Sequence, residues 1–179
     1  KYYIMIDTWP SPTCIPSFTL TIEECVVCDI TCDPAATPEP EPCGQDTNGG
    51  CLMDVPAFDP ITCDQIYCGT VWADPNFRDL DWYEITTTEP TKFTWTVTGE
   101  VDLVAGLVET TTPGSGNCAD ITGYVSPYAV IEDCEQASVV TTCLPAGTYW
   151  FLVMPAEFVN SPCSLEYQAT LTCEPCTVD

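Results

Sequence analysis

Lys92-Phe93-Thr94-Trp95-Thr96-Val97-Thr98-Gly99 is the stretch of sequence that decides the fold. Large apolar side chains alternate with threonines, so Phe93, Trp95 and Val97 fall on one face of an extended strand and the threonines on the other. Strands of antiparallel sheets commonly have one packed face and one face in water. The stretch therefore predicts a strand in a layered all-β domain.

The same alternation of β-branched and aromatic residues recurs on both sides of this stretch. No segment shows a convincing helical period, and 17 prolines and 10 glycines punctuate the chain. We expect strands at Leu80–Thr87, Lys92–Gly99, Val101–Val108, Ser138–Thr142, Gly147–Met154 and Leu165–Thr172. The predicted fold is an all-β, antiparallel, jelly-roll-like β-sandwich.

The first thirty residues repeat the pattern of the last thirty. An apolar pentapeptide recurs at an offset of 149 − 2 = 147 residues, and a C-x-x-C pair recurs at 173 − 25 = 148. The matched segments are Tyr2–Ile6 with Tyr149–Val153, Phe18-x-Leu20-x-Ile22 with Tyr167-x-Ala169-x-Leu171, and Cys25/Cys28 with Cys173/Cys176. An internal repeat on this scale is typical of tandem arrays, in which each unit packs on its neighbour.

This repeat divides the chain into three parts. We expect residues 1–32 to be an extra N-terminal β-hairpin, either the end of a preceding repeat or a docking segment. Residues 33–42 are rich in Pro and Glu, which predicts a stiff, solvated linker. Residues 43–179 form the predicted sandwich domain.

Charge excludes several classes of function. The net charge is −24, and Lys1, Arg78 and Lys92 are the only cations, so the molecule repels phosphate and anionic lipid. We expect no nucleic-acid partner and no membrane insertion, because no apolar run approaches the roughly 18 residues of a membrane span. The chain has no histidine, the usual general base for a serine or cysteine nucleophile, so we expect no enzymatic activity. Carboxylate pairs such as Glu132 and Asp133 are interpreted as solvated surface rather than as a glycosidase site.

Fourteen cysteines at this density predict a disulfide framework, and with it a secreted, extracellular protein. The predicted disulfide cysteines are Cys14, Cys25, Cys28, Cys32, Cys43, Cys51, Cys63, Cys68, Cys118, Cys134, Cys143, Cys163, Cys173 and Cys176. A local Cys63–Cys68 clip and a Cys118–Cys134 bridge fit the spacing. Spacing leaves the overall connectivity open, including bridges between units, and zinc remains the alternative use of the C-x-x-C pairs.

Three motifs resemble the bacterial pre-peptidase C-terminal domain, a calcium-associated β-sandwich of secreted and surface proteins. They are Asp79-Leu80-Asp81-Trp82-Tyr83, then Leu144-Pro145-Ala146-Gly147-Thr148-Tyr149-Trp150, and last Tyr167-x-Ala169-x-Leu171. The second, with its A-G-T-Y turn and strand, is the most specific. The dense cysteines depart from the family pattern.

The resemblance implies a calcium site between the predicted linker and the loop before the D-W-Y strand. Here its ligands would be Glu41, Asp46, Asn48, Asp79 and Asp81. Calcium takes six to eight oxygen ligands, and Asp46-Thr47-Asn48-Gly49-Gly50 alternates oxygen donors before two glycines. The alternative interpretation is an Asx-turn beside a solvated acidic surface.

Two functional hypotheses follow from these features. The first is a structural repeat of an extracellular, disulfide-stabilised fibre, tubule or surface layer, whose partners are neighbouring copies that join through the N-terminal hairpin and the cysteine-rich junctions. The second is a calcium-associated adhesin or a carbohydrate- or collagen-binding module with a glycan or protein ligand. Exposed aromatics such as Trp72, Trp82, Tyr124 and Tyr128 would supply its platform, although most are more simply core or loop anchors.

Overall fold

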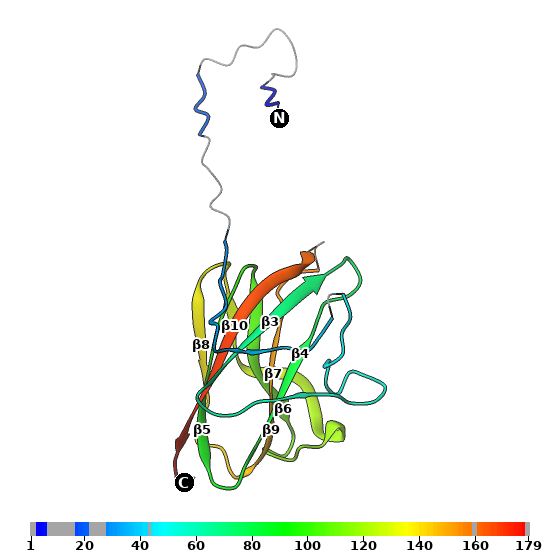
Figure 1. Ribbon diagram of the computed structural model, residues 1–179, viewed down its shortest axis with the longest axis vertical. Coiled ribbons are helices and arrows are strands. Elements are labelled where there is room, and N and C mark those ends of the chain that lie inside the picture. The colour runs from blue at the N-terminus through cyan, green and yellow to red at the C-terminus, as the bar shows by residue number, and fades with distance from the viewer. Residues whose placement is uncertain (1–2, 7–16, 22–27, 43, 159–160, 178–179) are drawn as a thin grey trace.

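The computed structural model describes residues 3–6, 17–21, 28–42, 44–158 and 161–177. Within these residues two five-stranded sheets pack face to face as a sandwich (Figure 1). The first sheet has the order β1 (Thr37–Pro38), β3 (Gln65–Ala73), β10 (Ser161–Pro175), β5 (Thr91–Gly99), β8 (Gln136–Val140). The second has the order β2 (Asp59–Pro60), β4 (Asp81–Thr87), β9 (Gly147–Pro155), β6 (Leu103–Thr110), β7 (Ile121–Ile131).

The predicted all-β sandwich is confirmed, and its main strand pairs are antiparallel. The exceptions are the two-residue edge strands β1 and β2, which run parallel to β3 and β4. The one short helix of the described chain, η1 (Cys118–Asp120), is a 3₁₀ turn before β7. No helix in the described ranges is long and apolar enough to cross a membrane.

The inner faces of the two sheets form the main core. Phe93, Trp95 and Val97 of β5 are fully buried there, as their alternation with threonine predicts. Strand β9 is buried on both faces, because Tyr149, Phe151 and Val153 face this core while Trp150 and Leu152 face outward. The outward residues join Trp82 and Val108 in a second cluster, beneath a loop whose Phe58 stacks on Trp150 at 5.1 Å between ring centroids.

All six predicted strands are present with ends shifted by a few residues. Besides the two-residue strands β1 and β2, the structure adds two long strands that were not predicted, β3 and β7. Both long strands contain residues that normally indicate a turn in a sequence. These are Gly69 in β3, and Gly123 and Pro127 in β7. β7 accommodates its proline because it is an edge strand.

The predicted N-terminal hairpin lies largely outside the described residues. Residues 3–6 and 17–21 are not in strands, and their side chains are exposed. The predicted linker is described in full, and it lies along the sandwich rather than spanning open solvent. Thr37 and Pro38 pair with Tyr67 and Cys68 of β3, and the Glu39 amide donates to the Cys68 carbonyl at 2.8 Å.

Five disulfides are described, and all of them join residues far apart in the chain. They are Cys28–Cys134, Cys32–Cys68, Cys51–Cys118, Cys63–Cys173 and Cys143–Cys176. Cys163 is also disulfide-bonded, whereas Cys14, Cys25 and Cys43 lie outside the described residues. The disulfide prediction is thus confirmed for eleven of the cysteines, and thiolate zinc ligation is excluded for them.

The two local bridges that spacing suggested are wrong. Cys63 and Cys68 lie on either side of the start of β3, so each meets a cysteine of another segment, Cys173 and Cys32 respectively. Cys118 and Cys134 lie at opposite ends of β7, an eleven-residue strand of about 36 Å, which no disulfide can bridge. Cys28 and Cys32 both bond cysteines of the sandwich within the same chain, so these two bridges join the N-terminal segment to the sandwich rather than one chain to another.

Candidate functional site

Two aspartates at the start of β4 are fully buried. Asp81 shares the inward face of the strand with Tyr83 and Ile85, because side chains two residues apart point the same way. Asp79 lies two residues earlier, and its amide donates to the Trp72 carbonyl at 3.0 Å. Both side chains are 0% exposed, and none of their four carboxylate oxygens makes a hydrogen bond of normal geometry, although the Tyr167 hydroxyl lies close enough to Asp81 to oppose the rise in its pKa.

Two glutamates approach these aspartates from the segment that follows β1. Glu39 accepts hydrogen bonds from the Asn48 side-chain amide at 2.8 Å and from the Thr70 backbone amide at 3.2 Å. Glu41 accepts a hydrogen bond from the Thr47 hydroxyl at 3.0 Å. One carboxylate oxygen each from Glu41, Asp79 and Asp81 lie within 4.8 Å of one another, the spacing of ligands around a single cation.

The loop from Asp46 to Gly50 closes the cluster. Asn48 is 2% exposed and donates to Glu39 and to Asp59, the latter at 3.0 Å, while its side-chain carbonyl oxygen has no partner. A Cβ atom at Gly49 would lie 2.6 Å from the Asp46 carboxylate. Gly50 has a φ of +60°, and a Cβ atom there would lie 2.1 Å from the Trp82 ring. Two glycines are therefore required to bring the loop onto β4.

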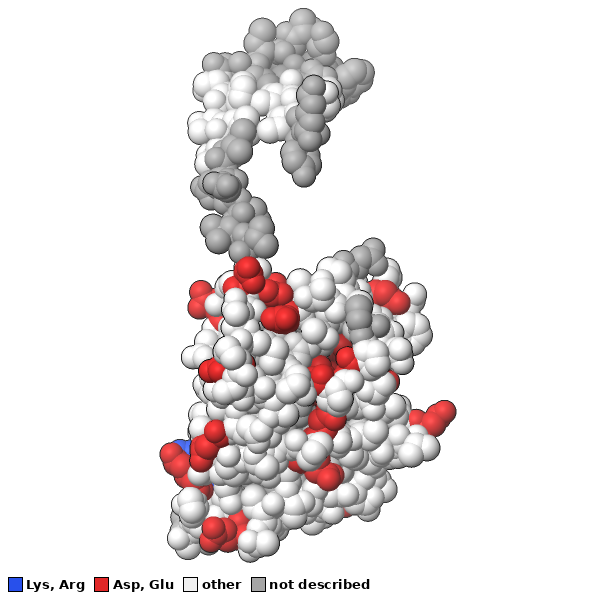
Figure 2. All heavy atoms as spheres, in the orientation of Figure 1, with Lys and Arg blue, Asp and Glu red and all other residues white. Residues whose placement is uncertain are grey.

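No basic side chain of the described residues forms an ion pair with this cluster. Arg78 donates to the carbonyls of Pro155 and Ala156 and stacks on Phe158, with the guanidinium carbon 4.1 Å from the ring centroid. The single ion pair of the described chain is Lys92–Glu174, at 4.0 Å. Figure 2 shows the imbalance, with Asp and Glu spread over the visible face and a basic residue only at its edge.

Crowding of carboxylates in a buried place changes their acidity. Burial, reinforced by the Glu41 charge, raises the pKa of Asp79 to about 9. Burial, with Glu39 and Asp79 nearby, raises the pKa of Asp81 well above its ordinary value. Burial also raises the pKa of Glu39, and burial with the Glu41 charge raises that of Asp46. The site therefore favours neutralisation, by protons or by a cation.

All five residues predicted as ligands lie in or beside this cluster. Asp46 lies close enough to Glu41 and Asp79 for their charges to act on one another, and Asn48 contacts the cluster through Glu39. Sequence reasoning missed Glu39 and Asp59. Glu39 stands two residues before Glu41, so the shared face of an extended Glu-Pro-Glu segment was a usable signal. No local sequence feature identifies Asp59 as a neighbour of this cluster.

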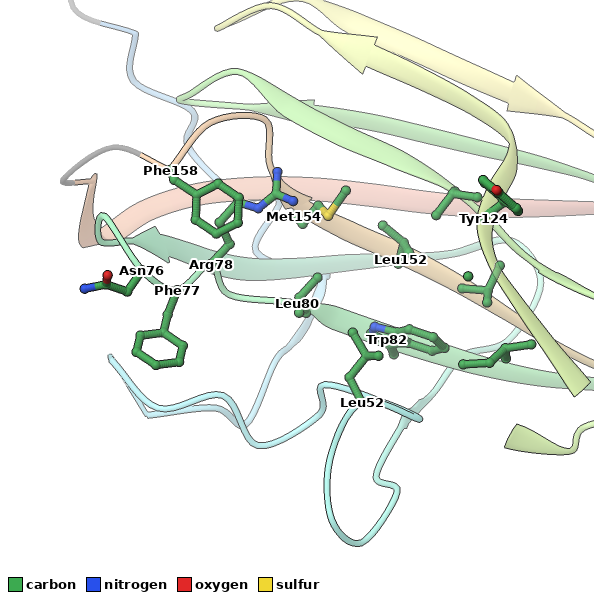
Figure 3. A pocket seen from close by; sticks show the side chains of 14 residues that line it. Leu52, Asn76, Phe77, Arg78, Leu80, Trp82, Tyr124, Leu152, Met154 and Phe158 are labelled. Atoms are coloured by element: carbon green, nitrogen blue, oxygen red, sulfur yellow. The ribbon is translucent and has the colours of Figure 1, made fainter. Parts of the chain in front are cut away.

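A second feature is an apolar groove on the outer face of the second sheet, with a volume of about 360 Å³. Figure 3 shows Leu52 beside Trp82, with Phe77 and Phe158 toward one end and Tyr124 toward the other. Of the aromatics suggested as a platform, Trp82 is buried at 4% exposure, whereas Tyr124 and Tyr128 are exposed. Tyr124 lines the groove and Tyr128 does not.

Fold and site together define a disulfide-rich β-sandwich that carries a buried cluster of carboxylates. Among solved structures it is similar to the pre-peptidase C-terminal domain of a collagenase from Bacillus anthracis, with 11% identity and a TM-score of 0.45 over 67% of this chain and 100% of that chain. It is also similar to a periplasmic inhibitor of g-type lysozyme from Aeromonas hydrophila, with 8% identity and a TM-score of 0.39 over 65% of this chain and 96% of that chain. The first belongs to the family that the sequence motifs resemble. No protein-family model and no curated protein matches the sequence.

Proposed function

We propose that the chain is a non-catalytic, calcium-binding module of an extracellular structural or adhesive protein. The observation that carries this proposal is the pair Asp79 and Asp81, both fully buried and both without a hydrogen bond of normal geometry. Burying an ionised carboxylate without compensation is strongly unfavourable. A bound cation would supply the missing positive charge and the missing contacts.

The donor set favours calcium among the common metal ions. Among the described residues, the cluster offers carboxylate oxygens and one amide oxygen, and no sulfur or imidazole donor belongs to it. Zinc and copper sites in proteins are usually built from sulfur and imidazole, whereas hard cations take oxygen. Calcium accepts six to eight oxygens in flexible arrangements, while magnesium requires a near-ideal octahedron and usually keeps several waters. Glu41, Asp46, Asn48, Asp79 and Asp81 would hold the ion, with Glu39 as a further candidate.

The role of the ion would be structural. It would tie the segment after β1, the loop from Asp46 to Gly50 and the start of β4 into one unit. The ion would reinforce the hydrogen bonds that already join these segments, from Thr47 to Glu41, from Asn48 to Glu39 and from the Trp82 amide to the Asn48 carbonyl. Calcium is abundant outside cells, and disulfides persist there. A module hardened by both is suited to a fibre, a surface layer or an adhesive stalk.

Calorimetric titration of the chelator-treated chain tests this proposal. We expect calcium to bind at one site and to raise the melting temperature, and we expect Asp79→Asn with Asp81→Asn to abolish both effects. Glu132→Gln with Asp133→Asn is the matched control, because it removes the same charge from an exposed turn and should leave binding unchanged. Binding of the ion by the double Asp→Asn variant with wild-type affinity would overturn the proposal.

A ligand-binding function is the second candidate, and the apolar groove is the observation that favours it. Phe77 and Tyr124 line the groove and are 65% and 70% exposed, and such side chains can stack on sugar rings or receive apolar side chains of a protein. If the groove is a binding site, Tyr124→Ala should reduce retention of the chain on a glycan or collagen matrix. Tyr128→Ala should have no effect, because Tyr128 is 61% exposed outside the groove. Equal retention of both variants would remove this candidate.

A further inference from the structure

The two N-terminal segments that repeat later in the chain correspond to two particular strands of the sandwich. Residues 3–6 correspond to Trp150–Val153 of β9, and residues 17–21 correspond to the part of β10 around Tyr167 and Ala169. Both β9 and β10 are central strands, each paired on both sides. The repeated sequences are therefore those of strands that lie in the middle of a sandwich.

The burial of β9 and β10 explains the sequence patterns of the two segments. β9 is covered on both faces, so Trp150, Phe151, Leu152 and Val153 are all buried. The corresponding residues 3–6 are Tyr-Ile-Met-Ile, apolar without interruption. β10 is covered on one face, so Tyr167 and Ala169 are buried while Gln168 between them is not. Its counterpart, Phe18-Thr19-Leu20-Thr21, alternates in the same way.

The uninterrupted apolar pattern of residues 3–6 argues against the addition of this segment to the edge of a sheet. A strand added at the edge of this sandwich would bury one face and leave the other in water, so alternation would suffice for it. Ile4 and Met5 point to opposite sides of an extended chain, and they are 61% and 87% exposed in the described structure. Phe18 and Leu20 are 63% and 50% exposed. Positions as central strands of a sandwich, each paired on both sides, would bury all four of these side chains.

The two ends of the sandwich fit a linear arrangement. The chain enters beside the end of β5, where Cys28 bonds Cys134 and its sulfur lies 3.6 Å from the Gly99 carbonyl oxygen. It leaves beside the start of β5, where the Cys176 amide donates to the Pro90 carbonyl at 3.1 Å. β5 has nine residues and spans about 30 Å, so the two points lie at opposite ends of the molecule (Figure 1).

We infer that residues 3–6 and 17–21 belong to the β9 and β10 strands of a second sandwich of the same fold, and that successive sandwiches join end to end. Cys28 is the counterpart of Cys176, so the last strand of one sandwich runs directly into the rim of the next. The Cys28–Cys134 and Cys32–Cys68 bridges then fasten that junction. The partner is a copy of this module, and the assembly is a rod. The inference does not depend on the calcium site.

Two fusions test the inference. In the first, residues 1–147 are placed directly before Lys1 of the full chain, so that residues 1–28 of the second copy must supply the last two strands of the leading sandwich. Cys143 of the leading copy is changed to serine, because the residue that bonds it is absent. In the matched control two full chains are joined head to tail, so that the leading sandwich has its own β9 and β10. Both are studied with saturating calcium, so that a failure of the calcium proposal cannot imitate a failure of this one.

Hydrogen exchange and disulfide mapping give the readouts. We expect the first fusion to contain two folded sandwiches, with amides of residues 3–6 and 17–21 of the second copy protected and with a bridge between Cys63 of the leading copy and Cys25 of the second. In the control these amides should exchange quickly, and Cys63 should bond Cys173 in both copies. Ile4→Asp with Leu20→Asp in the second copy should unfold the leading sandwich of the first fusion only. An unfolded leading sandwich in the unsubstituted first fusion, or failure of that fusion to fold while the control folds, would overturn the inference.

Discussion

Asp79 and Asp81 are unusual because two carboxylic acids are buried close together, and no basic side chain of the described residues forms an ion pair with them. Residue spacing explains the burial, since Asp81 follows the inward face of β4 and Asp79 precedes it by two residues. It does not explain how the charge is tolerated. A proton or a cation must occupy the cluster in the folded state, and the two can be distinguished because they compete.

Stability of the metal-free chain should fall as the pH rises from about 4 to about 9. Burial raises the pKa of Asp79 from 3.8 to about 9, so in that interval the folded chain holds a proton that the unfolded chain has lost. A state that binds more protons is favoured at lower pH, so the free energy of unfolding decreases through the interval. Well below pH 3.8 Asp79 carries a proton in both states, and its contribution to the slope disappears. Urea unfolding in the presence of chelator, repeated across this range, measures the effect.

Asp79→Asn is the variant that identifies the source of this slope. The amide cannot ionise, so the variant should show a flatter pH profile and should be more stable than the wild type at pH 8 without metal. Glu132→Gln serves as the control, because that side chain is exposed and should leave the profile unchanged. A wild-type slope in Asp79→Asn would mean that other groups carry the titration.

At the scale of elements, β5 was predictable from its alternation and β9 from its run of apolar and aromatic residues, whereas β3 was not predicted. β5 can be recognised from Phe93, Trp95 and Val97, which alternate with Thr94, Thr96 and Thr98. β3 cannot, because Gly69 interrupts its alternation. The structure shows why glycine is needed, since a Cβ atom there would lie 2.5 Å from the Tyr167 ring. The close approach that requires Gly69 comes from a residue almost a hundred positions later, which no local pattern contains.

Of the described disulfides, Cys51–Cys118 lies next to the loop that closes the carboxylate cluster. Cys51 directly follows Gly50 and bonds Cys118 of η1, whereas Cys143–Cys176 lies at the end of the sandwich where the chain leaves. We expect Cys51→Ser with Cys118→Ser to weaken calcium binding about tenfold or more, because Asp46 and Asn48 would no longer be held in place before the ion arrives. Removal of the bridge should also lower stability by about 2 to 5 kcal/mol.

Cys143→Ser with Cys176→Ser separates the two effects. It should lower stability by a similar amount while calcium affinity, measured by calorimetry well below the melting temperature, stays at the wild-type value. If both double variants lose affinity equally, the disulfides act through overall stability, and the proposed local role of Cys51–Cys118 is wrong.

At the scale of the molecule, the candidate ligands could be predicted only because the family resemblance placed Glu41 beside Asp79 and Asp81. Their positions, nearly forty residues apart, suggest no contact by themselves. The disulfide map shows the same limit, since Cys28 bonds a cysteine 106 residues away. Pairings of this kind depend on which strands become neighbours. Composition could not provide that information, although it did predict that the cysteines would be joined.

The net charge of −24 predicts that salt should stabilise the whole chain even when calcium is bound. With 27 acidic and 3 basic residues, repulsion between surface carboxylates opposes the compact state, and one calcium ion removes only two of these charges. Raising the ionic strength from about 0.01 M to about 0.1 M shortens the screening length from about 30 Å to about 10 Å. We expect a gain of about 1 kcal/mol, or about 2 to 4 °C in the melting temperature of a chain of this size. Calorimetry with saturating calcium measures this gain, and sodium and tetramethylammonium chloride should give equal shifts because screening depends on charge alone. A shift with sodium only would indicate a specific ion site, and no shift with either would show that surface repulsion does not limit stability.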